Sequence, residues 1–546
     1  MIETASQQPR MKLERLKPYA LVSILGSAYL ILVYLSSRPL IGAALGPIDD
    51  HEYVRYIRHG GESPIHIPAL VRNMTEVGSW GNSTRFRPTY YLLRVSGIYV
   101  LGENGGLRYL IRVVAHLGIA ITLAYALIRL VFPKLDLVRI SIASIVLSLA
   151  FFSVANWLDV TTRLGPSELG LNLALAALIL SFVLGSVNGN ATGCIFLLAV
   201  AASFLASGSK ENAIWAPVLL YPVFRLYVRR QPSRSVRWNL AWLAFVCAVL
   251  FQLWISVGVA ISLGESGENV YGAKISLSDI PSLTIDGLRA SLDLSTTLLI
   301  ALLVGIRWSR SATGNREEHL YYDRILIVAM SVVGVKTIDY VYYRGSFDAA
   351  RYGLTTSLLG TFVAGLLVLS LARMWWSSNG RVNDSRVIAK GLVVSVIATT
   401  AIFALSPTQD PYTAFTELHR QSVLVRKTSL DWRNQIEQIA ALDGVKGAQG
   451  ILLHVTDAGA FERTYALRHF LALEFPEMPF FLVADFPNDL AADPLVTILR
   501  DVSAGTVAAW EIQPLAEIAT IDRLACLTTG SLQTSPAYPC VATVGY

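Results

Sequence analysis

The sequence predicts an all-α polytopic membrane bundle of about eleven spans, followed by a small C-terminal α/β domain. Hydrophobic residues make up 53% of the 546 residues and charged residues only 15%, whereas soluble domains carry about 25% charged residues. Apolar runs near the ~20 residues that a membrane helix needs recur through positions 1–406. The net charge of +6 lies in short loops between these runs, which indicates topogenic charge and no nucleic-acid partner.

The predicted spans form a membrane domain over residues 1–406. The pair at 191–206 and 212–226 is short for a span. We expect the spans near 18–37, 107–131, 138–155, 168–187, 191–206, 212–226, 238–263, 287–306, 324–342, 355–374 and 388–406.

Basic residues in the loops predict the orientation of the bundle. Arg10, Lys12, Arg15 and Lys17 precede the first span, which places the N-terminus in the cytoplasm. The Arg-rich loops at 225–237, 307–324 and 373–390 agree with this orientation when the spans alternate. An odd number of spans then places the tail outside. We expect a multi-pass protein of a bacterial inner membrane, with the endoplasmic reticulum as the alternative.

The tail, residues 407–546, has a different sequence pattern. Apolar runs at Ile451–Val455 and Phe480–Ala484 flank a helical pattern at Ala458–Phe475, and this order predicts an extracytoplasmic α/β unit. No GxGxxG or P-loop opens its helices, so we assign it no cofactor and expect a docking or substrate-gripping module. Cys526 and Cys540 would be free to form a disulfide outside the cell.

Cysteines Cys194 and Cys247 lie inside apolar runs, where we interpret them as packing residues. Lys336 and Asp339 lie in the predicted span 324–342, and we expect them to find partners inside the bundle.

The first external loop, residues 38–106, begins with an acidic segment. Asp49, Asp50, His51 and Glu52 directly follow the first span, and carboxylates so close to lipid indicate function. An Asp here can serve as a general base, and Asp50, His51 and Glu52 can hold a divalent cation such as Mg²⁺, Mn²⁺ or Ca²⁺. The alternative is that Asp49 caps a helix from His51 to His59. Asp49 can serve both as the base and as the helix cap.

Basic and acidic side chains gather at other expected external helix ends. Arginines beside aromatics, as in Arg85-Phe86-Arg87-Pro88, suit a phosphate next to a sugar or lipid, and interfacial snorkelling is the alternative. These clusters would therefore bring acidic and basic side chains together on one external face. The orientation that places them there was inferred from the basic loops alone, independently of the clusters. The further clusters are Thr162–Glu168, Ser209–Asn212 and Arg344–Tyr352.

The order of these motifs resembles the GT-C superfamily of membrane glycosyltransferases, which includes protein O-mannosyltransferases and the aminoarabinose and arabinofuranosyl transferases. Asp49-Asp50, Arg85 to Pro88, and Ser209-Lys210-Glu211 carry the resemblance, which covers roughly residues 18 to 406. It implies inverting transfer of a sugar from a polyprenyl-phosphate donor to a glycan, lipid or protein acceptor outside the membrane.

The resemblance also implies roles for single residues. Asp49 and Asp50 would be the catalytic carboxylates. Asp49 would be the base that deprotonates the acceptor, while Asp50, His51 and Glu52 would bind a metal or orient the acceptor. Glu168 and Glu211 would orient the cations, and a structural ion pair between Lys210 and Glu211 is the alternative. The residues expected to neutralise the departing phosphate are Arg85, Arg87, Lys210, Arg344 and Arg351.

Other functions remain as alternatives. A transporter or flippase of a lipid-linked or anionic substrate would place charges near the middle of the membrane and often has broken helices. A polysaccharide polymerase would also use external arginines but has less need of an acidic pair after the first span. A membrane-anchored binding module would leave the external polar clusters unexplained.

Overall fold

The computed structural model divides the chain into two compact units. Unit 1 comprises Met1–Arg38, Ile111–Thr162 and Ser167–Gln421, and unit 2 comprises Pro39–Leu110, Arg163–Pro166 and Ser422–Tyr546. The structure describes residues 7–47, 53–54, 64–77, 87–210, 212–229, 231–233, 235–266, 279–310, 316–343, 353–378, 400–405, 408–447, 450–455, 461–476, 478, 480–484, 496–500, 509–513, 524–529 and 542–544.

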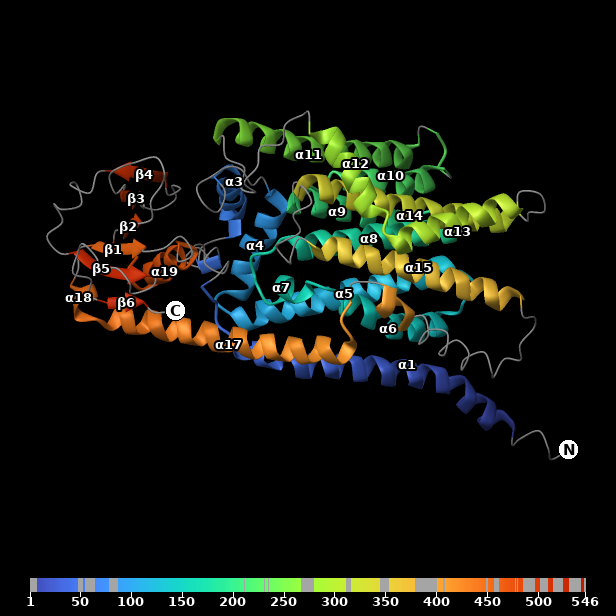
Figure 1. The fold of residues 1–546 in the computed structure, drawn as a ribbon, viewed down its shortest axis with the longest axis horizontal. Helices are drawn as coiled ribbons and strands as arrows, with labels where there is room; N and C mark the ends of the chain where they lie inside the picture. Colours follow the sequence, from blue (N-terminus) through green and yellow to red (C-terminus); the bar gives the residue numbers. More distant parts are fainter. Residues whose placement is uncertain are drawn as a thin grey trace. The chain divides into compact units, whose positions relative to one another are not determined.

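Unit 1 is a helical bundle (Figure 1). The long helix α17 (Pro411–Ala441) begins in unit 1 and continues into unit 2, and α5 (Gly105–Val131) begins in unit 2. The other helices of unit 1 are α1 (Gln7–Ser37), α6 (Leu137–Phe152), α7 (Trp157–Thr161), α8 (Glu168–Val187), α9 (Gly193–Ser209), α10 (Trp215–Val228), α11 (Val236–Ser266), α12 (Ile280–Ser291), α13 (Leu294–Arg310), α14 (Arg316–Tyr343) and α15 (Leu354–Ser378).

The protein is a multi-pass integral membrane protein. Among the described residues, six helices are long and apolar enough to cross a membrane, in α1, α5, α8, α11, α14 and α15. The pair α12 and α13, bent by 79°, would add a seventh span. The expected spans at 138–155, 191–206 and 212–226 correspond to the shorter apolar helices α6, α9 and α10. The run at 388–406 lies largely outside the described residues, so the count of about eleven stays a prediction.

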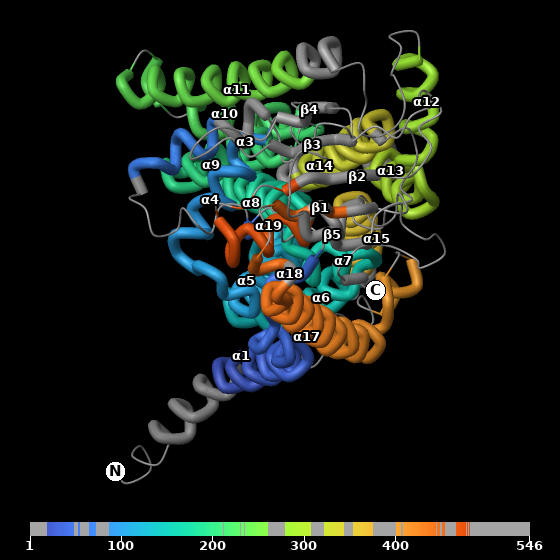
Figure 2. The backbone as a smooth tube through the Cα atoms, turned by 90° about the vertical axis from the view of Figure 1, so that its left-hand side faces the viewer, coloured from blue at the N-terminus to red at the C-terminus, as the bar shows by residue number. Residues whose placement is uncertain are grey.

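The bundle has a buried centre and a lipid-facing periphery. Helix α8 lies at the centre of the end view in Figure 2, surrounded by other helices, whereas α1 and α11 lie at opposite edges. The apolar windows of α8 and α15 are 67% and 78% buried, but those of α1 and α11 only 17% and 22%. Cys194 and Cys247 are exposed on α9 and α11. Their interpretation as packing residues was wrong, because these apolar helix faces point outward.

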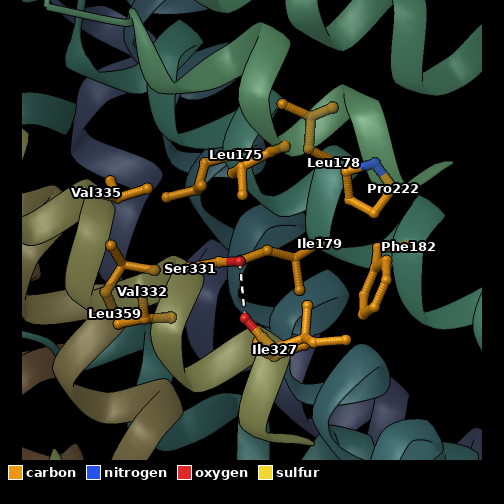
Figure 3. A pocket seen from close by; sticks show the side chains of 12 residues that line it. Leu175, Leu178, Ile179, Phe182, Pro222, Ile327, Ser331, Val332, Val335 and Leu359 are labelled. Atoms are coloured by element: carbon orange, nitrogen blue, oxygen red, sulfur yellow. Dashed lines mark hydrogen bonds between the residues drawn. The ribbon is translucent and has the colours of Figure 1, made fainter. Parts of the chain in front are cut away.

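A small apolar cavity lies between α8, α10, α14 and α15 (Figure 3). Its volume is about 30 Å³, far below the several hundred Å³ of a typical ligand site. Leu175 and Ile179 of α8 line it opposite Ser331 and Val332 of α14. The only polar side chain in its lining, Ser331, donates a hydrogen bond of 2.8 Å to the carbonyl of Ile327 on its own helix. The cavity is therefore a packing defect of the bundle.

Unit 2 contains most of the first external loop and the tail. The segment at Arg38–Gly42 is a 3₁₀ helix, as is Pro64–His66, and α3 (Ile67–Val77) packs on α4 (Pro88–Leu101). Tyr91, Val95 and Ile98 form the core of this contact. The remaining elements of unit 2 are α18 (Asp443–Lys446), α19 (Phe461–Glu474), β1 (Gly450–Val455), β2 (Phe480–Ala484), β3 (Val496–Arg500), β4 (Ala509–Gln513), β5 (Leu524–Thr529) and β6 (Ala542–Val544).

The six strands form one sheet in the order β4-β3-β2-β1-β5-β6 (Figure 1). Strands β1, β2, β5 and β6 are parallel, whereas β3 and β4 pair antiparallel. The elements β1, α19 and β2 follow one another along the chain, and α19 is the crossover between two parallel strands. A separate extracytoplasmic α/β domain stays a prediction. Cys526 lies in β5 opposite Leu452, and Cys540 lies outside the described residues, so their disulfide stays a prediction.

The division into two compact units follows other bounds than residue 407. The first part of α17 belongs to unit 1, and the sheet shares unit 2 with residues 39–110. Asp410 directly precedes α17, and its carboxylate accepts hydrogen bonds from the hydroxyl and the backbone N–H of Thr413. These bonds lower the pKa of Asp410 below its usual value, and the bond from the Thr413 hydroxyl has the largest effect. The expected boundary between 1–406 and 407–546 stays a prediction.

Candidate functional site

The turn that leads into the acidic segment is held by α5 and α17. Residues 43 and 45–47 are buried, and the N–H of Ala44 donates a hydrogen bond of 3.1 Å to Ser429 Oγ on α17. A Cβ on Gly105 would lie 2.6 Å from the Ala44 carbonyl, and one on Gly106 would lie 2.4 Å from the Ile41 carbonyl oxygen. Only glycine allows this approach. The turn therefore depends on two glycines and one serine that are distant in the sequence.

On the other side of the acidic segment, Tyr53 lies between two buried arginines. The guanidinium carbons of Arg94 and Arg108 lie 4.5 Å and 4.4 Å from the centre of the Tyr53 ring. Both distances are within the range of a cation–π interaction. Val54, the next residue, is buried. Tyr53 is therefore a second fixed point on the chain.

The three buried arginines of this region come from α4, its N-cap and the start of α5. Arg94 donates 3.3 Å to the carbonyl of Leu164 and lies over Tyr90, whose hydroxyl donates to the carbonyl of Gly165. Arg108 donates to two carbonyls, with the shorter bond of 2.6 Å going to Gly102. Arg87 is buried at the N-cap of α4, just before the proline that opens the helix. Three guanidinium groups are therefore buried in this region of unit 2.

The acidic segment itself, residues 48–52, lies outside the described residues. The described residues on either side of it are Pro47 and Tyr53. In the sequence, Glu52 directly precedes the ring that two guanidinium groups contact. These two buried cations are the main described feature of the candidate site in unit 2.

A second polar cluster lies inside unit 1. Lys210 follows α9 and forms an ion pair with Glu168 in the first turn of α8, and both side chains are almost fully buried. Asn212 donates a hydrogen bond of 2.8 Å to Asp339 of α14. Asp339 lies close enough to Lys210 and Glu168 to interact with both, so the four side chains form one buried polar cluster. Glu168 therefore contacts a cation, but its role in substrate binding stays a prediction, and Glu211 lies outside the described residues.

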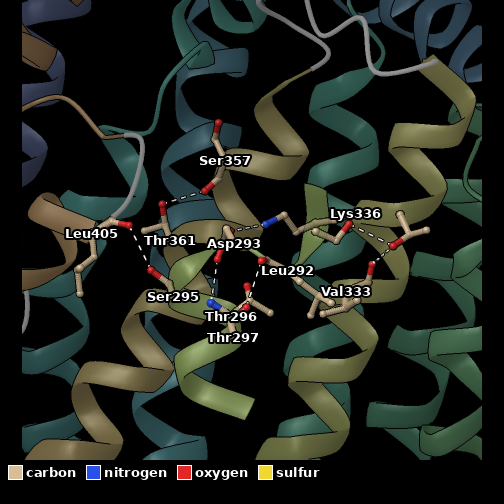
Figure 4. Close-up of polar contacts among 12 residues, drawn as sticks. Leu292, Asp293, Ser295, Thr296, Thr297, Val333, Lys336, Ser357, Thr361 and Leu405 are labelled. Carbon is tan, nitrogen blue, oxygen red and sulfur yellow. Dashed lines mark hydrogen bonds and ion pairs between the residues drawn. The ribbon is translucent and has the colours of Figure 1, made fainter. Parts of the chain in front are cut away.

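A second buried charged residue of α14, Lys336, contacts the break in the bent helix pair (Figure 4). Lys336 donates 2.7 Å to Asp293, which lies between α12 and α13 and accepts 2.8 Å from the N–H of Thr296. On the other side of the break, Thr337 bonds Ser291 at 3.1 Å. Lys336 and Asp339 therefore both find partners inside the bundle, as expected from the sequence. Asp293 caps α13 and neutralises Lys336 at the same time.

Several predicted site residues fall on parts of the chain that the structure leaves undescribed. The part that it describes holds no group of three or more His, Cys, Asp or Glu residues that could bind a metal ion, and the proposed metal ligands lie outside it. Of the predicted site residues, Arg87, Lys210 and Glu168 are described, and the others are Asp49, Asp50, His51, Glu52, Arg85, Glu211, Arg344 and Arg351.

The sequence interpretation missed Arg94 and Arg108. Both lie in apolar stretches, where an arginine is costly and indicates function. It also missed Tyr53 and Ser429, which act through contacts with residues far along the chain. A serine within the buried seam of an amphipathic helix was the available indication for Ser429.

Comparison with known proteins finds similarity among solved structures. No protein-family model and no curated protein matches the chain. Among solved structures, the chain is similar to the crystal structure of ArnT from Cupriavidus metallidurans bound to undecaprenyl phosphate. The two share 15% sequence identity over 88% of this chain and 96% of that chain, with a TM-score of 0.36. At this degree of likeness, the function has to be argued from the residues of the chain itself.

Proposed function

We propose that this protein is a membrane glycosyltransferase that transfers a sugar from a polyprenyl-phosphate donor to an extracytoplasmic glycan, lipid or protein by inverting displacement. The observation that carries the proposal is a pair of buried arginines beside the residue that follows the acidic segment in the sequence. The guanidinium carbons of Arg94 and Arg108 lie 4.5 Å and 4.4 Å from the centre of the Tyr53 ring.

The chemistry of the transfer needs one base and a cationic environment. Asp49 removes the proton of the acceptor hydroxyl, whose oxygen then attacks the anomeric carbon while the lipid phosphate leaves. Negative charge grows on the phosphate in the transition state, so fixed cations stabilise it. Arg87 and Lys210 are the described candidates for this role. We propose Arg85, Arg344 and Arg351 for the same role.

The acidic pair also suits a divalent cation. Carboxylate oxygens are the ligands of Mg²⁺, Mn²⁺ and Ca²⁺, and Asp50, His51 and Glu52 are the residues we propose for it. Such an ion would stabilise the leaving phosphate by charge alone. Dialysis against EDTA followed by return of each metal, with transfer as the readout, tests this part of the proposal.

We place the site on the non-cytoplasmic side of a bacterial inner membrane. The basic residues before the first span and in the loops at 225–237 and 373–390 support this orientation. The acidic segment follows the first span directly, which gives it access to an acceptor outside the cell.

A transfer assay tests the proposed function. The protein, in nanodiscs, receives radiolabelled polyprenyl-phosphate sugars and a crude envelope acceptor. We expect Asp49→Asn to lower the rate by about 10²–10⁴-fold, because the amide keeps the size but removes the base. Asp136→Asn is the matched control, since Asp136 is an exposed cap of α6 that pairs with Arg139. Equal rates for wild type and Asp49→Asn would exclude Asp49 as the base.

The broken helix pair supports one second candidate, a flippase of a lipid-linked substrate. Transporters often place a discontinuous helix with charged residues in the membrane, and α12 and α13 meet at 79° beside the pair of Lys336 and Asp293. Against this candidate, both carboxylate oxygens of Asp293 are engaged by the cap and the lysine. Movement of a fluorescent lipid across proteoliposomes, without any sugar transfer, would favour the flippase.

A further inference from the structure

Helix α12 contacts α14 through its smallest residues. Gly287 and Ser291, one turn apart, are its buried residues. A Cβ on Gly287 would lie 3.2 Å from the carbonyl oxygen of Thr337, and the hydroxyl of Thr337 donates a hydrogen bond of 3.1 Å to Ser291 Oγ. Small residues let two helices in a membrane approach closely. One face of α12 is therefore fixed on the bundle.

The rest of the α12 surface divides into an apolar face and a charged face. Ile285, Leu288 and Leu292 are 52%, 41% and 44% exposed, and their spacing of three and four residues places them on one side of the helix. Asp286 and Arg289 form an exposed ion pair of 3.3 Å. Each directly follows an apolar residue of this set and is therefore turned about 100° around the axis. Separate apolar and charged faces are typical of a helix that lies in the membrane interface.

The contacts of α14 give the depth of the break between α12 and α13 (Figure 4). The apolar segment of α14 is Tyr321–Tyr342, and Lys336, six positions before its end, bonds Asp293 at the break. At 1.5 Å per residue, the break lies about 9 Å inside this end of the segment. The apolar part of α13, Leu294–Ile306, is about 20 Å long. The two lengths together approach the ~30 Å of the hydrocarbon core, so both helices give the same depth.

Helix α12 stays close to this depth along its whole length. It has 12 residues and is about 18 Å long, and at 79° to α13 it rises only about 3 Å along the direction of α13. In the end view of Figure 2, α12 lies at the edge of the bundle. Its exposed apolar face continues past the break through Leu294, which is 70% exposed, to Leu298 of α13. The apolar face of α12 is therefore continuous with the outward surface of a spanning helix.

We propose that α12 is an interfacial helix that binds the lipid surface. Ile285, Leu288 and Leu292 lie among the acyl chains of one leaflet, and Asp286 and Arg289 lie among the headgroups. The depth of the break carries this inference, because it places the apolar face at the boundary between headgroups and acyl chains, where an interfacial helix is stable. In the orientation that we propose, this is the non-cytoplasmic leaflet. The inference does not rest on the proposed function, and neither sugar transfer nor the flippase candidate assigns this role to α12.

Spin labels on the full-length protein in nanodiscs test the proposal. A keto amino acid coupled to a nitroxide replaces Leu288 or Arg289, so the native cysteines stay in place. We expect the label at Leu288 to be accessible to oxygen, shielded from a water-soluble nickel complex, and about 5–10 Å below the lipid phosphates. The label at Arg289 should show the reverse accessibility. Leu298 of α13 is the control for lipid contact, and the exposed cap Asp136 is the control for water.

The labelled positions are exposed, so the labels leave the packed face of α12 unchanged. Ile285 and Asp286 repeat the comparison at a second position on each face. A label at Leu288 as accessible to the nickel complex as the water control would overturn the proposal. Shielding of that label from both reagents would also overturn it, because protein would then cover the face. Equal depths on the two faces would contradict an interfacial helix and leave α12 wholly inside the membrane.

Discussion

Replacement of Lys210 by methionine is expected to destabilise the bundle strongly. Lys210 and Glu168 are 1% and 3% exposed, and Asp339 is 1% exposed. The substitution removes the cation that pairs with Glu168 and leaves the Glu168 carboxylate buried without it. Removal of one partner of a buried pair costs about 3–5 kcal/mol, because the other charge stays buried. The folding equilibrium should therefore fall by roughly 10²–10⁴-fold.

A double-mutant cycle separates this penalty from the packing of the side chains. The four proteins are wild type, Lys210→Met, Glu168→Gln and the double variant, and their free energies of unfolding are measured by titration with SDS in mixed micelles. We expect the double variant to recover about 2 kcal/mol or more of the summed losses, because both charges leave together. Additive losses would show that the two side chains do not interact, and the structural argument would then be wrong.

The cycle also distinguishes a structural lysine from one that acts on the phosphate. If the pair only holds α8 and α9 together, the double variant regains both stability and transfer. If Lys210 neutralises the leaving phosphate, the double variant regains stability and still transfers sugar slowly, because the cation is missing in the transition state. We expect the second result.

Three further substitutions, each with a matched control, test the packing of the two units. Gly106→Ala should cost about 1–3 kcal/mol and lower the melting temperature, because its Cβ would overlap backbone carbonyls, whereas Gly118→Ala on the same helix meets open space and should be silent. Val332→Ile should fill the cavity of about 30 Å³ and add about 0.8 kcal/mol, while Val333→Ile, equally buried but outside the cavity lining, should destabilise. Tyr53→Leu should cost about 1–2 kcal/mol through the loss of two cation–π contacts, and Tyr53→Phe, which keeps the ring, should cost less; thermal unfolding in detergent measures both.

The sequence predicts the helices of the bundle well because lipid imposes a simple rule. Every backbone group of a spanning segment has to bond within its own helix, so apolar length alone reveals the segment. The break between α12 and α13 was not predicted from the run 287–306. Its only indications are Asp293 and a following threonine, which together form a helix cap. One polar residue changes the hydropathy of a window too little to divide it.

The pairing of side chains could not be predicted in the same way. Basic and acidic residues were placed at one end of the bundle from the loop charges, but their partners depend on how the helices pack. Lys210 pairs with Glu168, 42 positions away, and Asn212 with Asp339, 127 positions away. The bond between Ser429 and Ala44 spans 385 positions. Hydropathy carries no information about contacts of this separation.

The buried arginines of unit 2 depend on the groups that replace water around them. A guanidinium group is costly to bury, and it persists where carbonyls, aromatic faces or carboxylates replace water. Arg108 meets this requirement with two carbonyls and the ring of Tyr53. Arg94 meets it with the carbonyl of Leu164 and the same ring. Loss of the Tyr53 ring should therefore weaken the burial of both cations, which is the reason for expecting Tyr53→Leu to destabilise unit 2.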